Sequence, residues 1–263
     1  MPEGENRNLA GASTGVSPHA ARIAEWTKAQ TAPLVGWDFR EHPNKPVADP
    51  LPWDYLAVAR PLVDGARRML DLGTGGGEVL LGLAPLPSFS VVTELSEPRA
   101  QVAKQRLLAQ GACAAVLDST VALPFRPDAF DLVLCRNSAF VAAHVSAVVE
   151  PGGAFLTQQV ARGNLADLLD LLGAGDGNPD WQFPDQAAAD LEAAGFAQVD
   201  LRTADSFFEF VSVDAMLWFL NAILPGHIDV EACHEGLSEL QVRADRGEKL
   251  RFTRRRYLLQ ARK

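Results

Sequence analysis

A glycine-rich segment near residue 73 contains the residues of this sequence with the clearest chemical meaning. Asp71-Leu72-Gly73-Thr74-Gly75-Gly76-Gly77 follows a short apolar run and precedes a segment that has helical periodicity. Glycines at 73, 75 and 77 allow a sharp turn and let a ligand approach the backbone without an intervening Cβ. The N–H groups at the start of the next helix then face that ligand. The pattern predicts a binding loop for a small polar ligand.

The spacing of these glycines argues against a dinucleotide. A dinucleotide loop has the pattern G-x-G-x-x-G, and its third glycine would fall at position 78, which is Glu78 here. A glutamate at this position points a negative charge toward a pyrophosphate, so a nicotinamide oxidoreductase is disfavoured. Asp71 adds a carboxylate at the end of the expected strand, which suits a ligand with an ammonium group and no pyrophosphate.

Two further carboxylates end the next two expected strands. Glu94 ends the strand in VVTELS, where a carboxylate can accept hydrogen bonds from both ribose hydroxyls of an adenosine. Taken alone, Glu94 is explained equally well as a helix cap. Asp118 ends the strand in VLDST and precedes VALPFRPDAFDLVL.

These segments resemble the class I (seven-strand, Rossmann-like) S-adenosylmethionine-dependent methyltransferase family, with a type 11-like domain. DLGTGGG resembles the family's acidic-x-G-x-G-x-G motif, and VVEPGGAFL resembles its L-x-PGG-x-L turn. The stretch from Asp118 is similar to the family's D-x-x-x-LPF-x-x-x-x-FD-x-V segment, although four residues instead of three separate Asp118 from Leu123. The resemblance covers roughly residues 66–160.

The resemblance implies S-adenosylmethionine as the cofactor and S-adenosylhomocysteine as its product. It places Asp118 at the adenine amine and Ser119 at the adenine ring. The full set of cofactor-binding residues that it implies is Asp71, Gly73, Thr74, Gly75, Glu94, Leu95, Asp118, Ser119 and Asn137.

The acceptor is expected beyond the carboxyl ends of the fourth and fifth strands, in the crevice that open α/β sheets use. Arg136, Asn137 and Ser138 follow the fourth strand, and Gln158 and Gln159 come late in the fifth. Methyl transfer from a sulfonium is an in-line displacement with a neutral leaving group, so the protein contributes mainly orientation and the exclusion of water. A general base is needed only where the acceptor still carries its proton.

Asn137 and His144 are the candidate catalytic residues. Asn137 directly follows the fourth strand, and its amide can both donate and accept hydrogen bonds. His144 is a candidate base, but it shares a helix face with Phe140 and Val148, so a structural histidine is favoured.

Two subclasses of the family are disfavoured at this strand end. Members that methylate adenine or glutamine amides carry an (Asn/Asp/Ser)-Pro-Pro-aromatic turn, whereas this chain has Asn137-Ser138-Ala139-Phe140. Metal-dependent catechol methyltransferases need carboxylates here, and this chain offers Asn137 and Gln159. We therefore expect no metal site.

Short apolar runs that alternate with helical segments position these residues. Nearly continuous apolar strands separated by helices predict a doubly wound, mostly parallel α/β sheet that is covered on both faces. Residues 65–263 are expected to form the S-adenosylmethionine-binding domain, preceded by a flexible arm (1–17) and a helical lid segment (18–64). Within that segment Pro61 should end or kink the helix that begins near Asp54.

A long insertion precedes the last strand, at about residues 205–248. It is helical and apolar, and its length predicts a cap or a substrate wall. Together with the N-terminal lid segment it supplies aromatic side chains that either wall an acceptor pocket or pack the cap: Trp37, Trp53, Phe207, Phe208, Trp218 and Phe219.

RFTRRR in the last strand is the main basic cluster. On a strand, Arg251 and Arg255 face one side and Arg254 and Arg256 face the other. The sequence favours a solvated sheet edge over a phosphate-binding strip.

Composition narrows the function classes. The chain has 263 residues, 24 Lys and Arg against 33 Asp and Glu, and a net charge of −9, which disfavours a nucleic-acid partner. Cys113, Cys135 and Cys233 form no CxxC pair, and no apolar run approaches the roughly 20 residues of a membrane span. We expect a cytoplasmic monomer or homodimer with no membrane partner.

The leading hypothesis is metal-independent methyl transfer from S-adenosylmethionine to a small-molecule acceptor. The alternatives are an RNA or protein methyltransferase, and an enzyme of the same fold that uses bound S-adenosylmethionine electrostatically in a non-methylating rearrangement.

Overall fold

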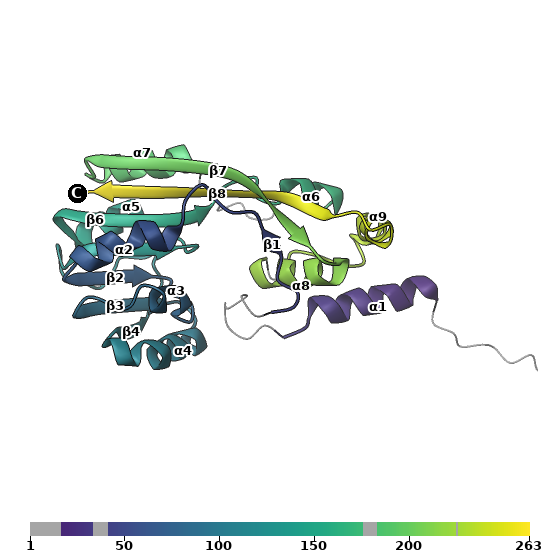
Figure 1. Cartoon of the computed structure of the whole chain (residues 1–263), viewed down its shortest axis with the longest axis horizontal. Coiled ribbons are helices and arrows are strands. Elements are labelled where there is room, and N and C mark those ends of the chain that lie inside the picture. The colour runs from purple at the N-terminus through teal and green to yellow at the C-terminus, as the bar shows by residue number, and fades with distance from the viewer. Residues whose placement is uncertain (1–16, 34–41, 176–182, 225) are drawn as a thin grey trace, which may run out of the picture.

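A mixed β-sheet forms the centre of the molecule. The computed structural model describes residues 17–33, 42–175, 183–224 and 226–263. Within these residues eight strands pair in the order β1-β7-β8-β6-β5-β2-β3-β4 (Figure 1). The strands are β1 (Val47–Ala48), β2 (Arg68–Leu72), β3 (Phe89–Glu94), β4 (Cys113–Val116), β5 (Phe130–Arg136), β6 (Val149–Val160), β7 (Gln198–Phe210) and β8 (Leu250–Arg262).

The central strands are parallel, as the sequence predicts. β2, β3, β4, β5 and β6 pair in parallel, whereas β8 is antiparallel to both β6 and β7, and β1 is antiparallel to β7. The expected doubly wound, mostly parallel α/β fold is confirmed. The helices are α1 (Pro18–Gln30), α2 (Tyr55–Gly65), α3 (Glu78–Leu81), α4 (Glu97–Leu107), α5 (Ala142–Val148), α6 (Ala166–Leu171), α7 (Pro184–Ala193), α8 (Val213–Ile223) and α9 (His234–Asp245).

Two hydrophobic cores cover the two faces of the parallel strands. On one face, Leu132 and Leu134 of β5 pack with residues of α2, α3 and α4. On the other face, Val133 and Cys135 pack with residues of α5 and α7. Successive side chains of a strand point to opposite faces, so alternate residues of β5 belong to different cores. Both faces are therefore buried, which explains the apolar runs in the sequence.

Pro61 was expected to end or kink the helix, and an end at this position is wrong, because Pro61 lies inside α2. The buried residues Tyr55, Ala59 and Val63 recur every four positions, so one face of α2 packs on the sheet along its whole length. Pro61 itself is exposed on another side of the helix. Burial of that apolar face outweighs the loss of one backbone donor at the proline.

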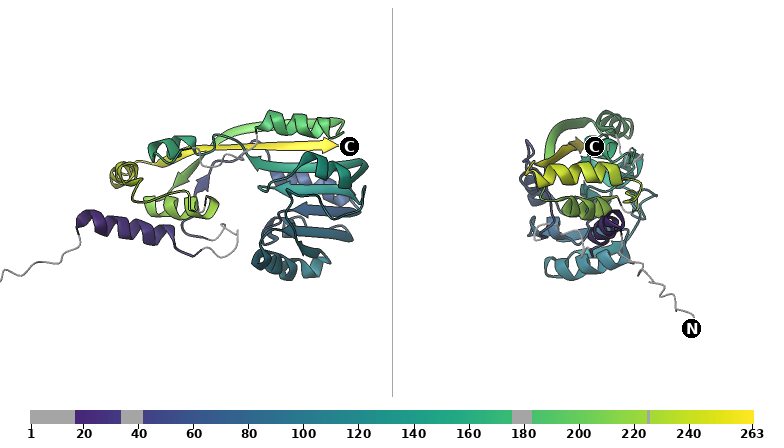
Figure 2. Two further views of the ribbon diagram at one scale, coloured as in Figure 1. Left: turned by 180° about the vertical axis from the view of Figure 1, so that it is seen from behind. Right: turned by 90° about the vertical axis from the view of Figure 1, so that its right-hand side faces the viewer.

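β7 and β8 are long and extend past the other strands (Figures 1 and 2). The expected insertion begins later than predicted, because residues 205–210 continue β7 as a strand. Ser206, Phe208 and Phe210 are buried while Asp205 and Phe207 are exposed, which is the alternation of a half-buried strand. The helical connection to β8 spans residues 211–249.

A third apolar core joins the N-terminal helix to this connection. Trp26 of α1, Trp218 of α8 and Phe252 of β8 are buried in it, and α6 and α9 contribute further leucines. Figure 2 shows α1 alongside α8, at the end of the molecule where the β7–β8 ribbon projects. We call the helices α1, α6, α8 and α9 the cap. Trp218 and Phe219 are thus cap core residues, and Trp37 lies outside the described residues.

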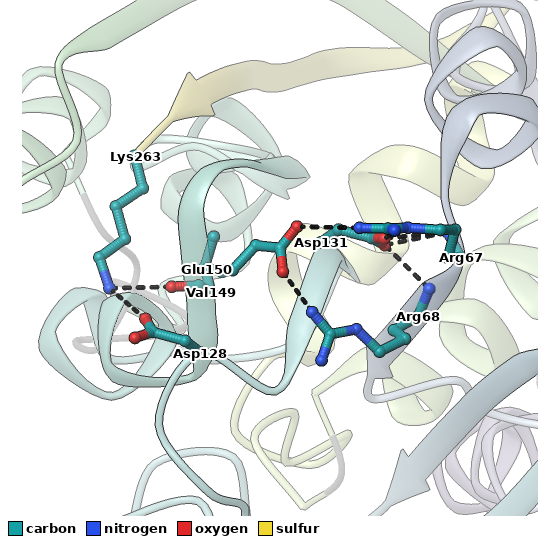
Figure 3. A network of polar contacts seen from close by, with 7 residues as sticks. All are labelled: Arg67, Arg68, Asp128, Asp131, Val149, Glu150 and Lys263. Carbon is teal, nitrogen blue, oxygen red and sulfur yellow. Dashed lines mark hydrogen bonds and ion pairs between the residues drawn. The ribbon is translucent and has the colours of Figure 1, made fainter.

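Charged residues at the amino ends of the strands bond one another (Figure 3). The Asp131 carboxylate accepts from the backbone N–H groups of Arg67 and Arg68, and Glu150 pairs with both arginine side chains. Lys263 Nζ donates to the Val149 carbonyl oxygen at 2.8 Å. This edge of the sheet has a structural network, and the predicted site residues lie at the opposite, carboxyl edge. None of the described helices has both the length and the apolarity to cross a membrane.

Candidate cofactor and acceptor site

The glycine loop connects β2 to α3 in a conformation that requires glycine. Gly73, Gly75 and Gly77 have φ angles of +69°, +61° and +81°, a region that L-residues with a Cβ rarely adopt. The Thr74 N–H donates to the Thr93 carbonyl oxygen at 2.8 Å, which fixes the loop against β3. A Cβ on Gly73 would lie 2.2 Å from Ser138 Oγ. The loop therefore passes close to the carboxyl end of β5.

Glu94 is buried at the carboxyl end of β3 and holds the glycine loop. Its Oε2 accepts from the Gly75 N–H at 3.0 Å, and its Oε1 accepts from the Ser96 N–H at 3.0 Å. Arg99 Nη1 lies 3.5 Å from Oε1. The carboxylate keeps free acceptor capacity beside the loop, as a ribose ligand requires. Leu95 follows the strand and is exposed.

Asp71 is buried at the end of β2 and receives no hydrogen bond to its carboxylate from any described residue. The pKa of Asp71 is raised to about 7, mainly by burial and to a smaller extent by the neighbouring Glu94. Thr74 and Arg136 act in the opposite direction. The Thr74 hydroxyl lies near enough to favour the charged carboxylate, but it is outside hydrogen-bond geometry and is buried without a partner among the described residues.

These observations fit the cofactor that the sequence motif implies. A buried, unbonded carboxylate matches the ammonium group of a methionine moiety. A backbone with no Cβ at 73 and 75 leaves space for a ligand to contact it. The buried, unpartnered hydroxyl of Thr74 offers a hydrogen bond at the same place.

Asp118 and Ser119 lie beyond the end of β4, because the strand stops at Val116 and does not reach Asp118 as predicted. The Asp118 Oδ1 accepts from the Thr120 N–H at 2.8 Å and from its hydroxyl at 2.6 Å, and these bonds lower the pKa of Asp118. Ser119 is buried and donates to the Ala139 carbonyl oxygen at 2.6 Å. This bond ties the loop after β4 to the loop after β5.

Asn137 directly follows β5 and is exposed. Its φ is +52°, in the left-handed region that asparagine tolerates better than most residues. Its N–H donates to the Gln158 carbonyl oxygen at 2.9 Å. Gln158 and Gln159 point to opposite faces: Gln159 Nε2 donates to the Ser138 carbonyl oxygen at 2.8 Å, whereas Gln158 faces the α2 side. The side chains of Gln158 and Gln159 therefore do not line the same site.

His144 is in α5, which packs in the core on the other face from Asp71. The helix begins at Ala142, so Phe140 precedes it and does not share a helix face with His144 as predicted. His144 is half-buried, and its Nδ1 is buried with no hydrogen-bond partner among the described residues. The structure does not bring His144 next to Asp71 and Arg136.

An aromatic pair from the N-terminal segment covers the carboxyl ends of β5 and β6. Trp53 Nε1 donates to Gln158 Oε1 at 2.8 Å. Tyr55 is buried, and the guanidinium carbon of Arg136 lies 5.7 Å from its ring centre. Burial and the neighbouring Asp71 raise the pKa of Tyr55. Tyr55 was not singled out from the sequence, where an aromatic residue one position after a helix N-cap has no special meaning.

Glu78 follows the glycine loop and is neutralised by a neighbouring arginine. Its carboxylate forms an ion pair with Arg106, and Arg106 also donates to the Gly76 carbonyl oxygen.

The basic cluster of β8 is solvated only in part: Arg251 and Arg255 are exposed, but Arg254 is half-buried and Arg256 is only 9% exposed. A solvated edge is thus wrong for the face that carries Arg254 and Arg256.

Comparisons with known proteins agree with this geometry. Residues 70–157 match the model of a type 11 methyltransferase domain. No curated protein matches the chain significantly. The YcgJ protein of Bacillus subtilis has a similar structure with a TM-score of 0.59 and 16% identity, over 79% of this chain and 97% of that chain.

Two other solved structures extend the likeness. A candidate methyltransferase from Bacillus halodurans C-125 gives a TM-score of 0.57 with 21% identity, over 79% of this chain and 98% of that chain. A protein of unknown function from Deinococcus radiodurans R1 gives 0.53 with 18% identity, over 92% and 97%. Residues 70–157 therefore match a methyltransferase domain, and the chain shares the fold of these solved structures.

Proposed function

We propose that the chain transfers the methyl group of S-adenosylmethionine to a small-molecule acceptor bound at the carboxyl ends of β5 and β6. One observation carries the proposal: polar groups at these strand ends lie beside the buried Asp71 carboxylate and beneath Trp53 and Tyr55. An acceptor in this position is shielded from water on the α2 side and lies next to the loop that would hold the cofactor.

The residues near the glycine loop have separable roles in this proposal. Asp71 binds the ammonium group of the cofactor, Glu94 binds the ribose, and Asp118 and Ser119 contact the adenine. Gly73, Thr74 and Gly75 present the backbone to the cofactor, and Leu95 lies beside the adenosine. When bound, the cofactor supplies an electrophilic methyl group on a positively charged sulfur.

Acceptor orientation is assigned to Asn137. Its position next to Arg136 and Gln158 suits a side chain that hydrogen-bonds the acceptor, because an amide can serve as donor and acceptor at once. No proton transfer to His144 is required where the acceptor atom has already lost its proton at neutral pH. The proposal includes no metal ion.

A small molecule suits this chain better than RNA, because the net charge of −9 opposes a phosphate backbone. The solved structure of a [4+2]-cyclase, SpnF, also has this fold, with a TM-score of 0.50 and 17% identity, but such a likeness concerns the fold alone. Methyl transfer and a non-methylating reaction therefore have to be separated by experiment.

The test is production of S-adenosylhomocysteine. The full-length protein is incubated with S-adenosylmethionine and a metabolite extract, and S-adenosylhomocysteine is measured by mass spectrometry. We expect product in excess of a no-extract control, and much less product with the Glu94→Ala variant when the S-adenosylmethionine concentration is close to the wild-type Kd. If the cofactor binds but no S-adenosylhomocysteine forms with any extract, methyl transfer is wrong and a non-methylating use of the cofactor replaces it.

A further inference from the structure

Three arginine side chains belong to one face of the sheet near the proposed acceptor site. They are Arg136 at the end of β5 and Arg254 and Arg256 in β8, and we call them the arginine cluster. Arg136 pairs in register with Gln158, Gln158 with Leu258, and Arg256 lies two residues from Leu258. Registered partners, and alternate residues along one strand, point to the same face. All three arginines therefore share the face of Gln158 and Trp53.

Phe208 of β7 brings the two β8 arginines together. The guanidinium carbons of Arg254 and Arg256 lie 5.3 and 5.6 Å from the Phe208 ring centre. Phe208 is itself buried, at the boundary between the sheet and the cap. The two cations thus flank one aromatic ring close to the place where the β7–β8 ribbon leaves the parallel strands.

The arginine cluster lacks carboxylate partners. Arg256 Nη1 donates to Asn164 Oδ1 at 2.5 Å and to the Arg255 carbonyl oxygen at 2.7 Å, and Arg254 Nη1 donates to the Asp49 carbonyl oxygen at 2.8 Å. Arg254 Nε is buried and has no hydrogen-bond partner in the described part of the chain. Among the described residues, no carboxylate forms an ion pair with any of the three guanidinium groups.

The other face of β8 shows the usual arrangement. Arg251 forms an ion pair with Asp49, and Arg255 Nε lies 3.3 Å from a carboxylate oxygen of Asp205. Those two arginines are exposed, where a cation costs little. The same strand thus pairs its exposed arginines with carboxylates and leaves its less exposed ones without.

The three cations, of which Arg256 is buried and Arg136 and Arg254 are half-buried, repel one another. Burial, together with Arg254 and Arg136, lowers the pKa of Arg256 to about 9, and burial and Arg136 lower the pKa of Arg254. Asp71 and Asp49 reduce this cost through longer-range attraction to Arg136 and Arg254. A buried cation that lacks a close counter-ion is costly, and an anionic ligand would offset that cost.

We propose that the arginine cluster binds an anionic group of the methyl acceptor, a carboxylate or a phosphate. This inference rests on the proposed function, because it concerns the substrate of that same site. Guanidinium groups bind both oxyanions through charge-assisted hydrogen bonds. Phe208 supplies an apolar surface beside the anion, and Asn137, next in sequence to Arg136, would face the part of the acceptor that is methylated.

The first test measures binding of a bare oxyanion. Inorganic phosphate and pyrophosphate are titrated into the full-length protein with saturating S-adenosylhomocysteine, at constant ionic strength, by calorimetry. We expect binding to the wild type and an affinity about tenfold or more lower for Arg254→Gln and Arg256→Gln, as for loss of a charged hydrogen bond. Arg256→Lys, which keeps the charge, should lose less than Arg256→Gln.

Arg255→Gln is the matched control, because it removes the same charge from the adjacent position on the other face. It should change the oxyanion affinity by no more than about twofold. Affinity for S-adenosylhomocysteine should stay at the wild-type level in every variant and reports correct folding. If Arg256→Gln misfolds, Arg254→Gln decides. Absence of oxyanion binding to the wild type, or equal losses with Arg254→Gln and Arg255→Gln, overturns the inference.

The second test separates this inference from the proposed function. The metabolite extract is divided by anion exchange, and S-adenosylhomocysteine production is measured with each fraction. If activity is found in the anion-retained fraction, and Arg254→Gln raises the KM for that fraction while Arg255→Gln does not, the result supports both methyl transfer and an anionic acceptor. Activity only in the unretained fraction overturns the anionic acceptor and leaves methyl transfer standing. Activity in neither fraction contradicts methyl transfer, and the oxyanion titration then decides the arginine cluster alone.

Discussion

The Glu94 Oε2 atom accepts a hydrogen bond from the backbone N–H of Gly75 at 3.0 Å. This bond joins the carboxyl end of β3 to the glycine loop after β2, so the two parts of the proposed adenosine site are held as one unit. The carboxylate also accepts from Ser96 at the start of α4. Glu94 therefore has both a structural role and a proposed ligand-binding role.

The first prediction separates these roles. Glu94→Ala removes the ribose acceptor and should weaken binding of S-adenosylhomocysteine by about 1.5–3 kcal/mol, roughly ten- to 150-fold. Calorimetry measures the affinity. Arg99→Gln is the control, because it removes the 3.5 Å ion pair of Glu94 but leaves the carboxylate in place, so it should change the affinity much less. Wild-type affinity in Glu94→Ala would refute the assignment of Glu94.

A second prediction concerns the close approach of Gly73 to Ser138. Gly73→Ala places a Cβ 2.2 Å from Ser138 Oγ at a φ of +69°, so it should both destabilise the protein and lower its cofactor affinity. Gly152→Ala is matched in backbone strain, with a φ of +80°, but its Cβ would meet nothing within 4 Å. Gly152→Ala should lower the free energy of unfolding only through backbone strain, by about 1–2 kcal/mol.

The clash itself can be tested with a double variant. Ser138→Gly removes the two Ser138 atoms nearest to the new Cβ, so it should recover part of the stability that Gly73→Ala loses. Thermal denaturation and calorimetry measure the two quantities. If Gly73→Ala and Gly152→Ala lose equal stability and both bind the cofactor normally, the close approach has no functional consequence.

A third prediction follows from the raised pKa of Asp71. Its folded-state pKa of about 7 lies above its value of 3.8 in the unfolded chain. Ionisation therefore opposes folding: the stabilising effect of the protonated form is present at low pH and is lost as the pH rises from about 4 to about 7. Asp71→Asn should gain in unfolding free energy relative to the wild type over this range, and the difference should level off above pH 7.

The same shift makes cofactor binding pH-dependent, which is a fourth prediction. The ammonium group of S-adenosylhomocysteine favours ionised Asp71, so binding at pH 6 must first remove a proton from most molecules. Affinity should rise about tenfold between pH 6 and pH 8, with proton release detectable in buffers of different ionisation enthalpy. Asp71→Asn should bind weakly and show no such rise. A pH-independent wild type would contradict a buried, protonated Asp71.

The sequence alone predicted the parts of this molecule that depend on local spacing. The glycine loop, the carboxylates at 71 and 94, and the alternation of apolar strands with helices are contained in short stretches, and each is found where expected. Their meaning depends on backbone geometry that only a few residue types allow.

Features that depend on distant contacts were not predictable in this way. Burial of Arg256 results from β8 lying between β6 and β7 and from Phe208 beside it, and the run of arginines in one strand contains no sign of either. Tyr55 covers Arg136 because α2 packs its whole face on the sheet in spite of Pro61. In both cases tertiary packing outweighs the local preference of the residue.

The last prediction compares Asn137 with His144. Because Asn137 adopts a φ of +52°, Asn137→Ala would add backbone strain to the loss of the amide, whereas Asn137→Gly removes the amide and keeps the conformation unstrained. Turnover of Asn137→Gly should fall by about a hundredfold if the amide orients the acceptor, with cofactor affinity largely retained. His144→Ala should keep most of the activity, since α5 packs in the core on the face opposite to Asp71.

Initial rates are measured with and without a chelator, and strong inhibition by the chelator would contradict a metal-free reaction. An inactive His144→Ala that folds and binds the cofactor normally would instead assign His144 as the general base, and its buried, unpartnered Nδ1 would then be the atom to examine.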